Sequence, residues 1–309
     1  MSTLRKFLEK CNIDAEIAYE EPMAAHTSFR IGGPAEAFVK PRTAKATAAL
    51  LAAARDFGVP VATVGGGANL LVADAGVRGV VLSTELLRGL SRRDDGSLYA
   101  EAGLPVVDLV RSAIRDGEAG LEFAAGLPGS VGGAVYMNAR CYDREFADAL
   151  LGIAYLDPLT LEPATATVER DAWAYKRTPF MPGGALAGAL ILGARFRLTH
   201  GDRAALEARA AELEADRATK GHFDYPCAGS VFKNDRSFGR PTGKILDELG
   251  FRGRRVGDAM VSPKHANIFV NAGRATASDM SVLIAQAIAE AKAAFGIELE
   301  PEVVTLGDF

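Results

Sequence analysis

The segment that most constrains how this chain can fold spans residues 120–138 and reads GLEFAAGLPGSVGGAVYMN. It contains five glycines, and Glu122 is its only charged residue. Clustered glycine lets a backbone approach a ligand closely or make tight turns. The segment therefore suits a large, flat, mostly apolar ligand held by backbone hydrogen bonds, such as an isoalloxazine ring, and it suits a buried, turn-rich connection equally well.

A second glycine cluster stands at residues 64–72, which read VGGGANLLV. Three glycines after an expected buried strand free several backbone N–H groups to point at one spot, the arrangement that holds an anion such as a diphosphate. The dinucleotide fingerprint G-x-G-x-x-G is absent, because Leu70 stands where its last glycine would be. A Rossmann nicotinamide site is therefore disfavoured, and a tight turn between strands remains the alternative.

Apolar periodicity and turn residues predict alternating strands and helices over the whole chain. Helix starts are expected at Thr43, at Asp202 and at Thr276, where Asp279 completes a capping box. The expected helices span residues 44–57, 105–116, 202–220, 243–249 and 277–295. The expected strands span residues 59–64, 70–72, 79–83, 98–102, 152–156, 190–198, 266–271 and 297–306, and the strand 190–198 is expected to be half exposed.

Bulk composition narrows the class of protein. A length of 309 residues exceeds one ordinary compact core, so two or three domains are expected, with a boundary near Gly201. The net charge is −4 and the basic residues are scattered, which argues against a nucleic-acid partner. The first ten residues lack the apolar core of a signal peptide, and no apolar run approaches the roughly 20 residues of a membrane span. We therefore expect a cytoplasmic protein without a membrane partner.

Cysteine and histidine spacing argues against a metal. Cys11, Cys141 and Cys227 show no C-x-x-C pattern, and the four histidines lack the spacing of metal ligands. Neither a metal site nor a disulfide framework is expected.

Two further segments carry residues capable of chemistry. Residues 228–235, AGSVFKND, expose Ser230 close to Lys233 and Asn234, but a serine needs an activating neighbour and such a segment is also an ordinary turn. Glu302 stands just ahead of the last expected strand, where it could face a cleft or, as composition favours, solvent. No G-x-S-x-G elbow is present, so a hydrolase triad has no support.

Taken together, six motifs favour a functional interpretation of these segments over ordinary turns. They occur in the order TSFRIGGPA (27–35), VGGGANLLV (64–72), GLPGSVGGAVYMNA (126–139), AGSVFKN (228–234), KHAN (264–267) and LEPEV (299–303). The set resembles the UDP-N-acetylenolpyruvoylglucosamine reductase family, the flavoenzymes of peptidoglycan synthesis, from about residue 20 to the last strand. The compact region between residues 180 and 230 is similar to the shorter form of the family.

The resemblance implies an α+β chain with an FAD-binding fold of the vanillyl-alcohol-oxidase type. Two FAD-binding subdomains would span residues 1–90 and 91–200, and a substrate-binding domain would span residues 201–309, with its last strand returning to the active site. The implied reaction passes hydride from NADPH through non-covalent FAD to a carbon–carbon double bond of a nucleotide sugar and yields UDP-N-acetylmuramate. This role would place the protein in cell-wall biogenesis, and so in cell shape and division, as a monomer whose partner is a small molecule.

Site residues follow from the resemblance position by position. Ser230 takes the proton-donor position, and Glu302 takes the carboxyl position near the developing enol. The substrate positions fall on Tyr175, Lys220, Lys233 and Asn234. The FAD diphosphate would be held by Gly65, Gly66, Gly67, Ala68, Asn69 and Leu70, and the flavin edge by Gly126, Pro128, Gly129, Ser130, Gly132 and Gly133.

The sequence departs from the family pattern in two places. The family usually reads Tyr-Arg-x-Ser, with the arginine polarising the substrate carboxylate, whereas this chain reads YKRT at residues 175–178. Lys176 holds the arginine position by register, but a lysine cannot form the bidentate fork, and Arg177 one place on is the alternative. In the second place, Gly221 and His222 replace the usual Gln-Pro, and Cys227 replaces a serine. Lys220 is then expected to stand in for the substrate contact.

Two other functions remain open from the sequence. One is an FAD-dependent oxidase of the same fold that acts on an alcohol or a sugar lactone, against which the AGSVFKN and LEPEV segments argue. The other is a nucleotide-binding module without catalysis, which would be purified without colour.

Overall fold

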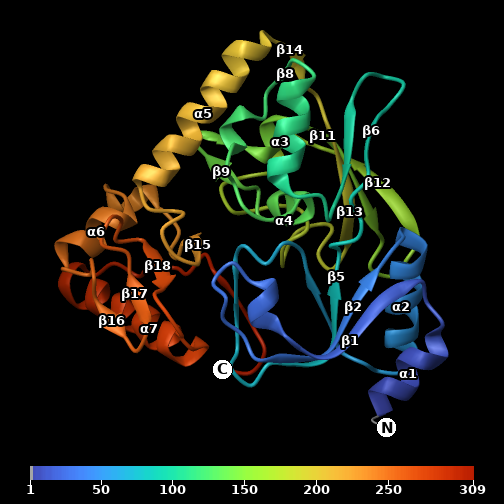
Figure 1. Ribbon diagram of the computed structural model, residues 1–309, viewed down its shortest axis with the longest axis horizontal. Helices are drawn as coiled ribbons and strands as arrows, with labels where there is room; N and C mark the ends of the chain where they lie inside the picture. Colours follow the sequence, from blue (N-terminus) through green and yellow to red (C-terminus); the bar gives the residue numbers. More distant parts are fainter. Residues whose placement is uncertain (1–2) are drawn as a thin grey trace. The chain divides into compact units, whose positions relative to one another are not determined.

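The computed structural model describes residues 3–309 as a mixed α+β chain (Figure 1). Its α-helices are α1 (Thr3–Cys11), α2 (Ala44–Asp56), α3 (Val106–Arg115), α4 (Val131–Tyr136), α5 (Arg203–Thr219), α6 (Thr242–Glu248) and α7 (Ala277–Phe295). Its strands are β1 (Ala15–Pro22), β2 (Pro34–Pro41), β3 (Val61–Val64), β4 (Leu70–Val72), β5 (Val77–Ser83), β6 (Leu90–Arg92), β7 (Leu98–Glu101), β8 (Glu118–Ala119), β9 (Arg140–Cys141), β10 (Arg144–Glu145), β11 (Leu150–Leu156), β12 (Pro163–Thr167), β13 (Leu190–Phe196), β14 (Thr199–His200), β15 (Cys227–Ser230), β16 (Arg255–Val256), β17 (Ala259–Val261), β18 (Ile268–Asn271) and β19 (Val304–Leu306).

Three larger sheets organise these strands. The first has the order β1-β2-β5-β3, in which β3 and β5 run parallel. The second has the order β12-β11-β13-β7-β6, with every neighbouring pair antiparallel. The third, β15-β18-β17-β16, is also antiparallel. The last strand, β19, instead pairs in parallel with β4, so the end of the chain returns to the second glycine cluster.

The chain divides into two compact units, each with its own core. The first comprises the described residues 3–19, 37–66 and 79–214, and the second comprises residues 20–36, 67–78 and 215–309. In the first unit, α3 and α4 cover the five-stranded sheet, with Phe146 set edge-on against Phe123 and Phe196. In the second unit, Phe232 and Phe269 meet edge-on at 5.8 Å beneath α7.

The capped helices lie where the sequence predicts them. The Thr43 side chain accepts a hydrogen bond from the N–H of Ala46 at 3.0 Å, and Asp202 accepts one from Ala205 at 2.8 Å. At the start of α7, Thr276 and Asp279 form the reciprocal capping box. These starts are predictable because a cap side chain bonds to a backbone group only three residues away.

Other expectations were wrong in detail. Residues 131–136 form α4 inside the glycine-rich segment, although Gly132 and Gly133 disfavour a helix, because Val131 and Val135 bury themselves and the Ser130 side chain caps the first turn. The last strand covers only Val304–Leu306 of the predicted 297–306. Strand β13 is almost wholly buried rather than half exposed, since it is central in its sheet. Helix α1 and strands β1 and β2 were not predicted.

Candidate active site

The two glycine-rich segments meet within the first unit. The Ser130 side-chain oxygen accepts hydrogen bonds from the N–H of Gly66 at 3.1 Å and from that of Gly133 at 3.4 Å. A Cβ atom on Gly65 would lie 2.4 Å from that oxygen, and one on Gly66 would lie 2.7 Å from the Cα of Gly129. Glycine is therefore required at residues 65 and 66 for the loops to approach each other, a reason that composition did not reveal.

The same place offers backbone donors to a ligand. Within residues 3–309, the N–H groups of Gly65, Gly129 and Ser130 have no hydrogen-bond partner. Grouped backbone N–H donors suit the oxygen atoms of a diphosphate or of a flavin ring. Gly126, with a φ of +67°, opens the turn, Pro128 is exposed, and Gly132 packs so closely that a Cβ would lie 2.8 Å from the Cβ of Ala102. These residues fit an FAD site.

The rest of the VGGGANLLV loop belongs to the second unit. A Cβ on Gly67 would lie 1.9 Å from the carbonyl oxygen of His26, so this glycine is needed for packing against the TSFRIGGPA segment. The Asn69 side chain donates to the carbonyl of Glu302 at 2.9 Å, and the Asn69 carbonyl accepts from Val304 at 3.0 Å. Beyond the half-buried Ala68, Leu70 begins β4 opposite Val304. The loop therefore holds the strand that follows Glu302.

Ser230 and Glu302 lie on adjoining backbone segments of the second unit. The N–H of Glu302 donates to the carbonyl of Val231 at 2.7 Å, and Phe232 forms a β-bridge with Pro301. Ser230 is the last residue of β15, and both Ser230 and Glu302 are half buried. Two residues far apart in the sequence thus lie on neighbouring stretches of backbone, while the roles expected for their side chains stay predictions.

Asn267, of the KHAN motif, supports the strand after Ser230, a role that the sequence did not indicate. Its buried side chain accepts from the N–H of Phe232 at 3.0 Å and donates to the carbonyl of the same residue at 2.9 Å. Its own carbonyl accepts from the N–H of Val231 at 2.9 Å. The only available signal was the presence of Asn267 in a motif that carried the resemblance.

The predicted substrate residues of the second unit also have structural partners. Lys233 forms an ion pair with Glu300. The Asn234 side-chain oxygen accepts from the N–H of Thr242 at 2.9 Å, at the start of α6. Lys220, which directly follows α5, pairs with Asp216 of that helix at 2.6 Å. Each of these residues can still offer further N–H donors to a substrate, because an ammonium group has three and the Asn234 bond uses only its oxygen.

The YKRT segment is a tight turn in the first unit. Ala174 and Arg177 exchange both backbone hydrogen bonds at 3.0 Å, which leaves Tyr175 and Lys176 at the tip. Lys176 has a φ of +53°, a value that turns usually assign to glycine or asparagine. Lys176 is half buried whereas Arg177 is exposed. Lys176 thus lies at the tip in a strained conformation, and the choice between Lys176 and Arg177 as the functional cation stays a prediction.

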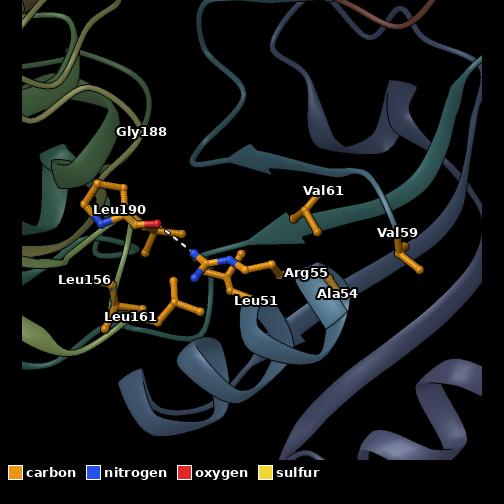
Figure 2. A pocket seen from close by; sticks show the side chains of 10 residues that line it. Leu51, Ala54, Arg55, Val59, Val61, Leu156, Leu161, Gly188 and Leu190 are labelled. Atoms are coloured by element: carbon orange, nitrogen blue, oxygen red, sulfur yellow. Dashed lines mark hydrogen bonds between the residues drawn. The ribbon is translucent and has the colours of Figure 1, made fainter. Parts of the chain in front are cut away.

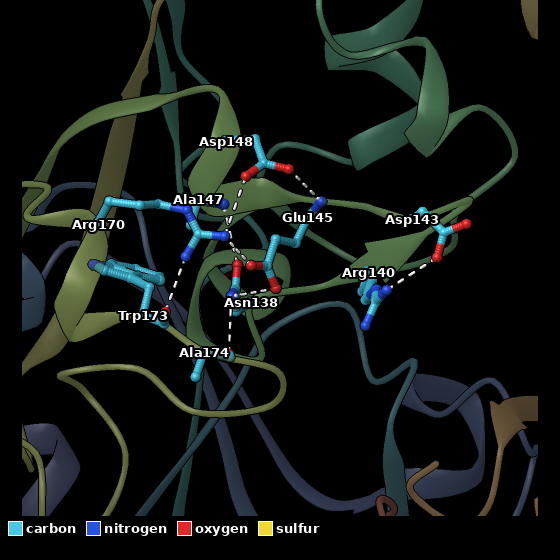
Figure 3. Close-up of polar contacts among 9 residues, drawn as sticks. All are labelled: Asn138, Arg140, Asp143, Glu145, Ala147, Asp148, Arg170, Trp173 and Ala174. Carbon is cyan, nitrogen blue, oxygen red and sulfur yellow. Dashed lines mark hydrogen bonds and ion pairs between the residues drawn. The ribbon is translucent and has the colours of Figure 1, made fainter. Parts of the chain in front are cut away.

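A buried polar network fixes this turn (Figure 3). The fully buried Asn138 donates to the Ala174 carbonyl at 3.0 Å and to the Glu145 carboxylate at 2.9 Å, and it accepts from the N–H of Ala147 at 3.0 Å. Arg170 pairs with Glu145 and with Asp148 on the other side. Asn138 is the last residue of the first glycine-rich segment, so its side chain connects that segment directly to the YKRT turn.

Comparison with known proteins decides the family. The chain matches the model of the FAD binding domain over residues 35–159 and that of the UDP-N-acetylenolpyruvoylglucosamine reductase C-terminal domain over residues 221–306. The reductase of Treponema denticola is 37% identical, with 96% of this chain and 95% of that protein covered. That of Syntrophus aciditrophicus is 37% identical, with 99% and 96% covered. This chain belongs to the UDP-N-acetylenolpyruvoylglucosamine reductase family.

A crystal structure of the reductase from Thermus caldophilus matches with a TM-score of 0.77 and 30% identity, covering 95% of this chain and 99% of that one. The resemblance, the α+β class and the FAD-binding domain are thereby confirmed. Within residues 3–309, no group of three or more His, Cys, Asp or Glu side chains could hold a metal ion. No helix in the same range is long and apolar enough to cross a bilayer.

The departures from the reductase family near residue 222 contact one another. The Cys227 thiol donates to the carbonyl of His222 at 3.5 Å, and Gly221 has a φ of +82° that suits glycine. Burial, followed by the charges of Arg217, His265 and Lys220, lowers the pKa of His222 to about 4. Burial also raises the pKa of the Cys227 thiol. Both side chains are therefore neutral at pH 7.

A pocket of about 230 Å³ lies elsewhere in the first unit (Figure 2). Aliphatic side chains from α2, β3, β11 and β13 line it, and Arg55 closes one side by donating to the carbonyls of Pro158 and Leu159 at 2.7 and 2.6 Å. None of the site residues predicted for a reductase lines this pocket. It therefore has no part in the candidate active site.

Proposed function

We propose that this chain reduces the enolpyruvyl double bond of UDP-N-acetylglucosamine enolpyruvate to give UDP-N-acetylmuramate, with NADPH and non-covalent FAD, as a cytoplasmic step of peptidoglycan synthesis. The observation that carries the proposal is the hydrogen bond from the N–H of Glu302 to the carbonyl of Val231. It brings the backbone of Glu302 next to that of Val231, the residue that follows Ser230. Membership of the reductase family supplies the chemistry that such a pair would serve.

Backbone donors hold the cofactor in this proposal. The N–H groups of Gly65, Gly129 and Ser130 would hold FAD, and Gly67 keeps the rest of the loop against residue 26. Bound FAD would supply the redox chemistry, taking a hydride from NADPH and releasing it to the substrate. The residues around it bind, orient and exclude water.

Side chains then donate a proton to the substrate and stabilise its negative charge. Ser230 donates the proton to the α carbon, and Glu302 hydrogen-bonds to the carboxylate that becomes enolic. Lys176 stabilises the negative charge that develops on that carboxylate, an effect that is strong in a site closed to water. Tyr175, Lys220, Lys233 and Asn234 contact the nucleotide sugar.

We propose the domain limits 1–90, 91–200 and 201–309. In support, the strands of the three larger sheets lie at residues 15–83, 90–196 and 227–271, so each sheet falls almost entirely inside one domain. We also propose that the protein is a monomer, which sedimentation equilibrium of the FAD-loaded chain would test.

The proposal is tested by separating the two half-reactions without oxygen. The purified protein should be yellow, NADPH should bleach it, and the enolpyruvyl nucleotide should restore the colour. Ser230→Ala should leave bleaching near the native rate and slow recolouring by about 100-fold or more. Ser237→Ala, an exposed serine of the same unit, is the matched control.

Three outcomes would contradict it. Equal slowing of both half-reactions by Ser230→Ala would make Ser230 a structural residue. Rapid turnover with oxygen and an alcohol or sugar lactone would indicate an oxidase. A colourless protein that binds only ADP-like ligands would indicate a non-catalytic module.

A further inference from the structure

Two cations lie against one aromatic ring in the first unit. The guanidinium carbon of Arg140 is 5.6 Å from the centroid of the Tyr175 ring, and the Lys176 Nζ atom is 5.8 Å from the same centroid. Both distances fall within the range of a cation–π contact. Arg140 was not among the residues predicted from the sequence. The ring thus gathers two positive charges at the turn that the family uses to bind the substrate carboxylate.

A second tight turn sets the position of Arg140. Strands β9 and β10 form a hairpin in which Arg140 is opposite Glu145. Its two-residue loop, Tyr142 and Asp143, has φ values of +51° and +62°, the signs of a type I′ turn. Figure 3 shows the Glu145 carboxylate directed at Asn138 and Arg170 instead of at Arg140. Glu145, although it is opposite Arg140 in the hairpin, therefore does not neutralise the charge of Arg140.

The remaining partner of Arg140 is weak. Its guanidinium pairs with Asp143 at 3.0 Å, but the Asp143 side chain is 96% exposed, so solvent screens the pair. The Arg140 side chain itself is only 27% exposed. An anionic ligand can therefore displace the carboxylate of Asp143 at little cost.

Lys176 reaches the same ring from the other turn. Its position depends on the Asn138 bond to Ala174 and on the Thr178 hydroxyl, which donates to the carbonyl of Tyr136 at 3.0 Å. Both anchors belong to the segment that contains α4 and leads directly into Arg140. The turn that carries Lys176 is consequently hydrogen-bonded to the same stretch of backbone that leads into Arg140.

We propose that Arg140 is a substrate-binding residue that acts with Lys176 on the enolpyruvyl carboxylate, an inference that rests on the proposed function. A lysine is a point charge, whereas a guanidinium binds a carboxylate through two parallel hydrogen bonds. Arg140 thus supplies the fork that is lost where Lys176 replaces the family's arginine. A carboxylate between the two cations also offsets their mutual repulsion.

The test compares two ligands that share the nucleotide diphosphate and differ in the carboxylate. Affinities of the oxidised FAD-loaded enzyme for the enolpyruvyl nucleotide and for UDP-N-acetylglucosamine are measured by calorimetry without NADPH. Arg140→Met should weaken binding of the enolpyruvyl nucleotide by about 10- to 100-fold and leave the affinity for UDP-N-acetylglucosamine unchanged. Adding Lys176→Arg to Arg140→Met should restore most of the loss.

Arg144→Met is the matched control, since Arg144 belongs to the same hairpin but lies over the Phe123 ring at 5.5 Å. Equal weakening of both ligands by Arg140→Met, or no weakening of either, would overturn the inference. If Arg140→Met does not fold, Arg140→Lys decides, because it keeps the charge and should still lose part of the carboxylate affinity. If the native enzyme does not bind the enolpyruvyl nucleotide at all, that result would instead contradict the proposed function.

Discussion

The Ser130 hydroxyl accepts a hydrogen bond from the backbone N–H of Gly66 at 3.1 Å and thereby joins two glycine-rich segments that are far apart in the sequence. The same oxygen caps α4, so one side chain starts a helix and positions a loop. In both segments, glycines allow one stretch of the protein to approach another closely.

Gly66→Ala should disrupt this junction. Its Cβ would lie 2.7 Å from the Cα of Gly129, and because backbone cannot yield as a flexible side chain does, we expect about 1–3 kcal/mol of destabilisation and release of FAD. Urea unfolding and the flavin-to-protein ratio after gel filtration measure the two effects. Gly58→Ala, which meets nothing within 4 Å, should lose only about 1 kcal/mol because of its positive φ and should retain flavin. Equal flavin loss in both variants would contradict the steric explanation.

Asn138→Ala should release the cationic turn. The variant leaves the N–H of Ala147 and the carbonyl of Ala174 without the hydrogen bonds that Asn138 makes. The free energy of unfolding should therefore fall by about 1–3 kcal/mol. Bleaching by NADPH should stay near native while recolouring by the substrate slows. Asn138→Asp should be worse than alanine, because it places a second carboxylate beside Glu145 and cannot donate to Ala174. A milder effect for aspartate would show that the amide donor has no positioning role.

Lys176→Gly should stabilise the protein while it impairs the reaction. Glycine relieves the φ of +53°, so we expect the free energy of unfolding to rise by up to about 1 kcal/mol as the substrate half-reaction slows. Glu20→Gly, at a similar φ of +52° on an exposed residue, should match the stability change without the kinetic one. Arg177→Ala distinguishes between the two candidate cations, Lys176 and Arg177. We expect it to slow the substrate half-reaction much less than Lys176→Gly does. A larger effect from Arg177→Ala would assign the carboxylate to that residue.

The stability of the native fold should depend on His222 below neutral pH. Its pKa is lowered to about 4 in the folded state, against about 6.5 in the unfolded chain, so the unfolded state binds a proton first. Above pH 6.5 both states are neutral and His222 has no effect on the pH dependence. As the pH falls from 6.5 to 4, protonation of His222 stabilises the unfolded state, and the free energy of unfolding falls by up to about 3 kcal/mol.

Urea titrations of the native chain and of His222→Gln between pH 7.5 and pH 4.5 measure this difference. The variant should lose less stability on acidification than the native chain does. His200→Gln, at an exposed residue, should behave as the native chain. Parallel pH curves for His222→Gln and the native chain would show that the imidazole is not held neutral.

Local signals explain what could be predicted from the residues alone. Thr43, Asp202 and Thr276 predict helix starts because a cap and its partner are three residues apart. The six ordered motifs indicate the reductase family because each is a short contiguous string of residues. Glycine clusters likewise mark where backbone must come close to something. What they come close to is not encoded locally.

Only the tertiary structure decided that Gly66 meets Ser130, that Glu302 bonds beside Ser230 and that Arg140 shares the Tyr175 ring with Lys176. Each of these contacts joins residues that are distant along the chain, and which of them meet depends on how buried sheets and helices pack. Helix α4 shows the same dependence, because burial of Val131 and Val135 overrides the poor helix propensity of two glycines. The sequence by itself therefore determined the capped helices and indicated the family through local motifs, whereas packing determined α4, the extent of the last strand and which distant segments meet.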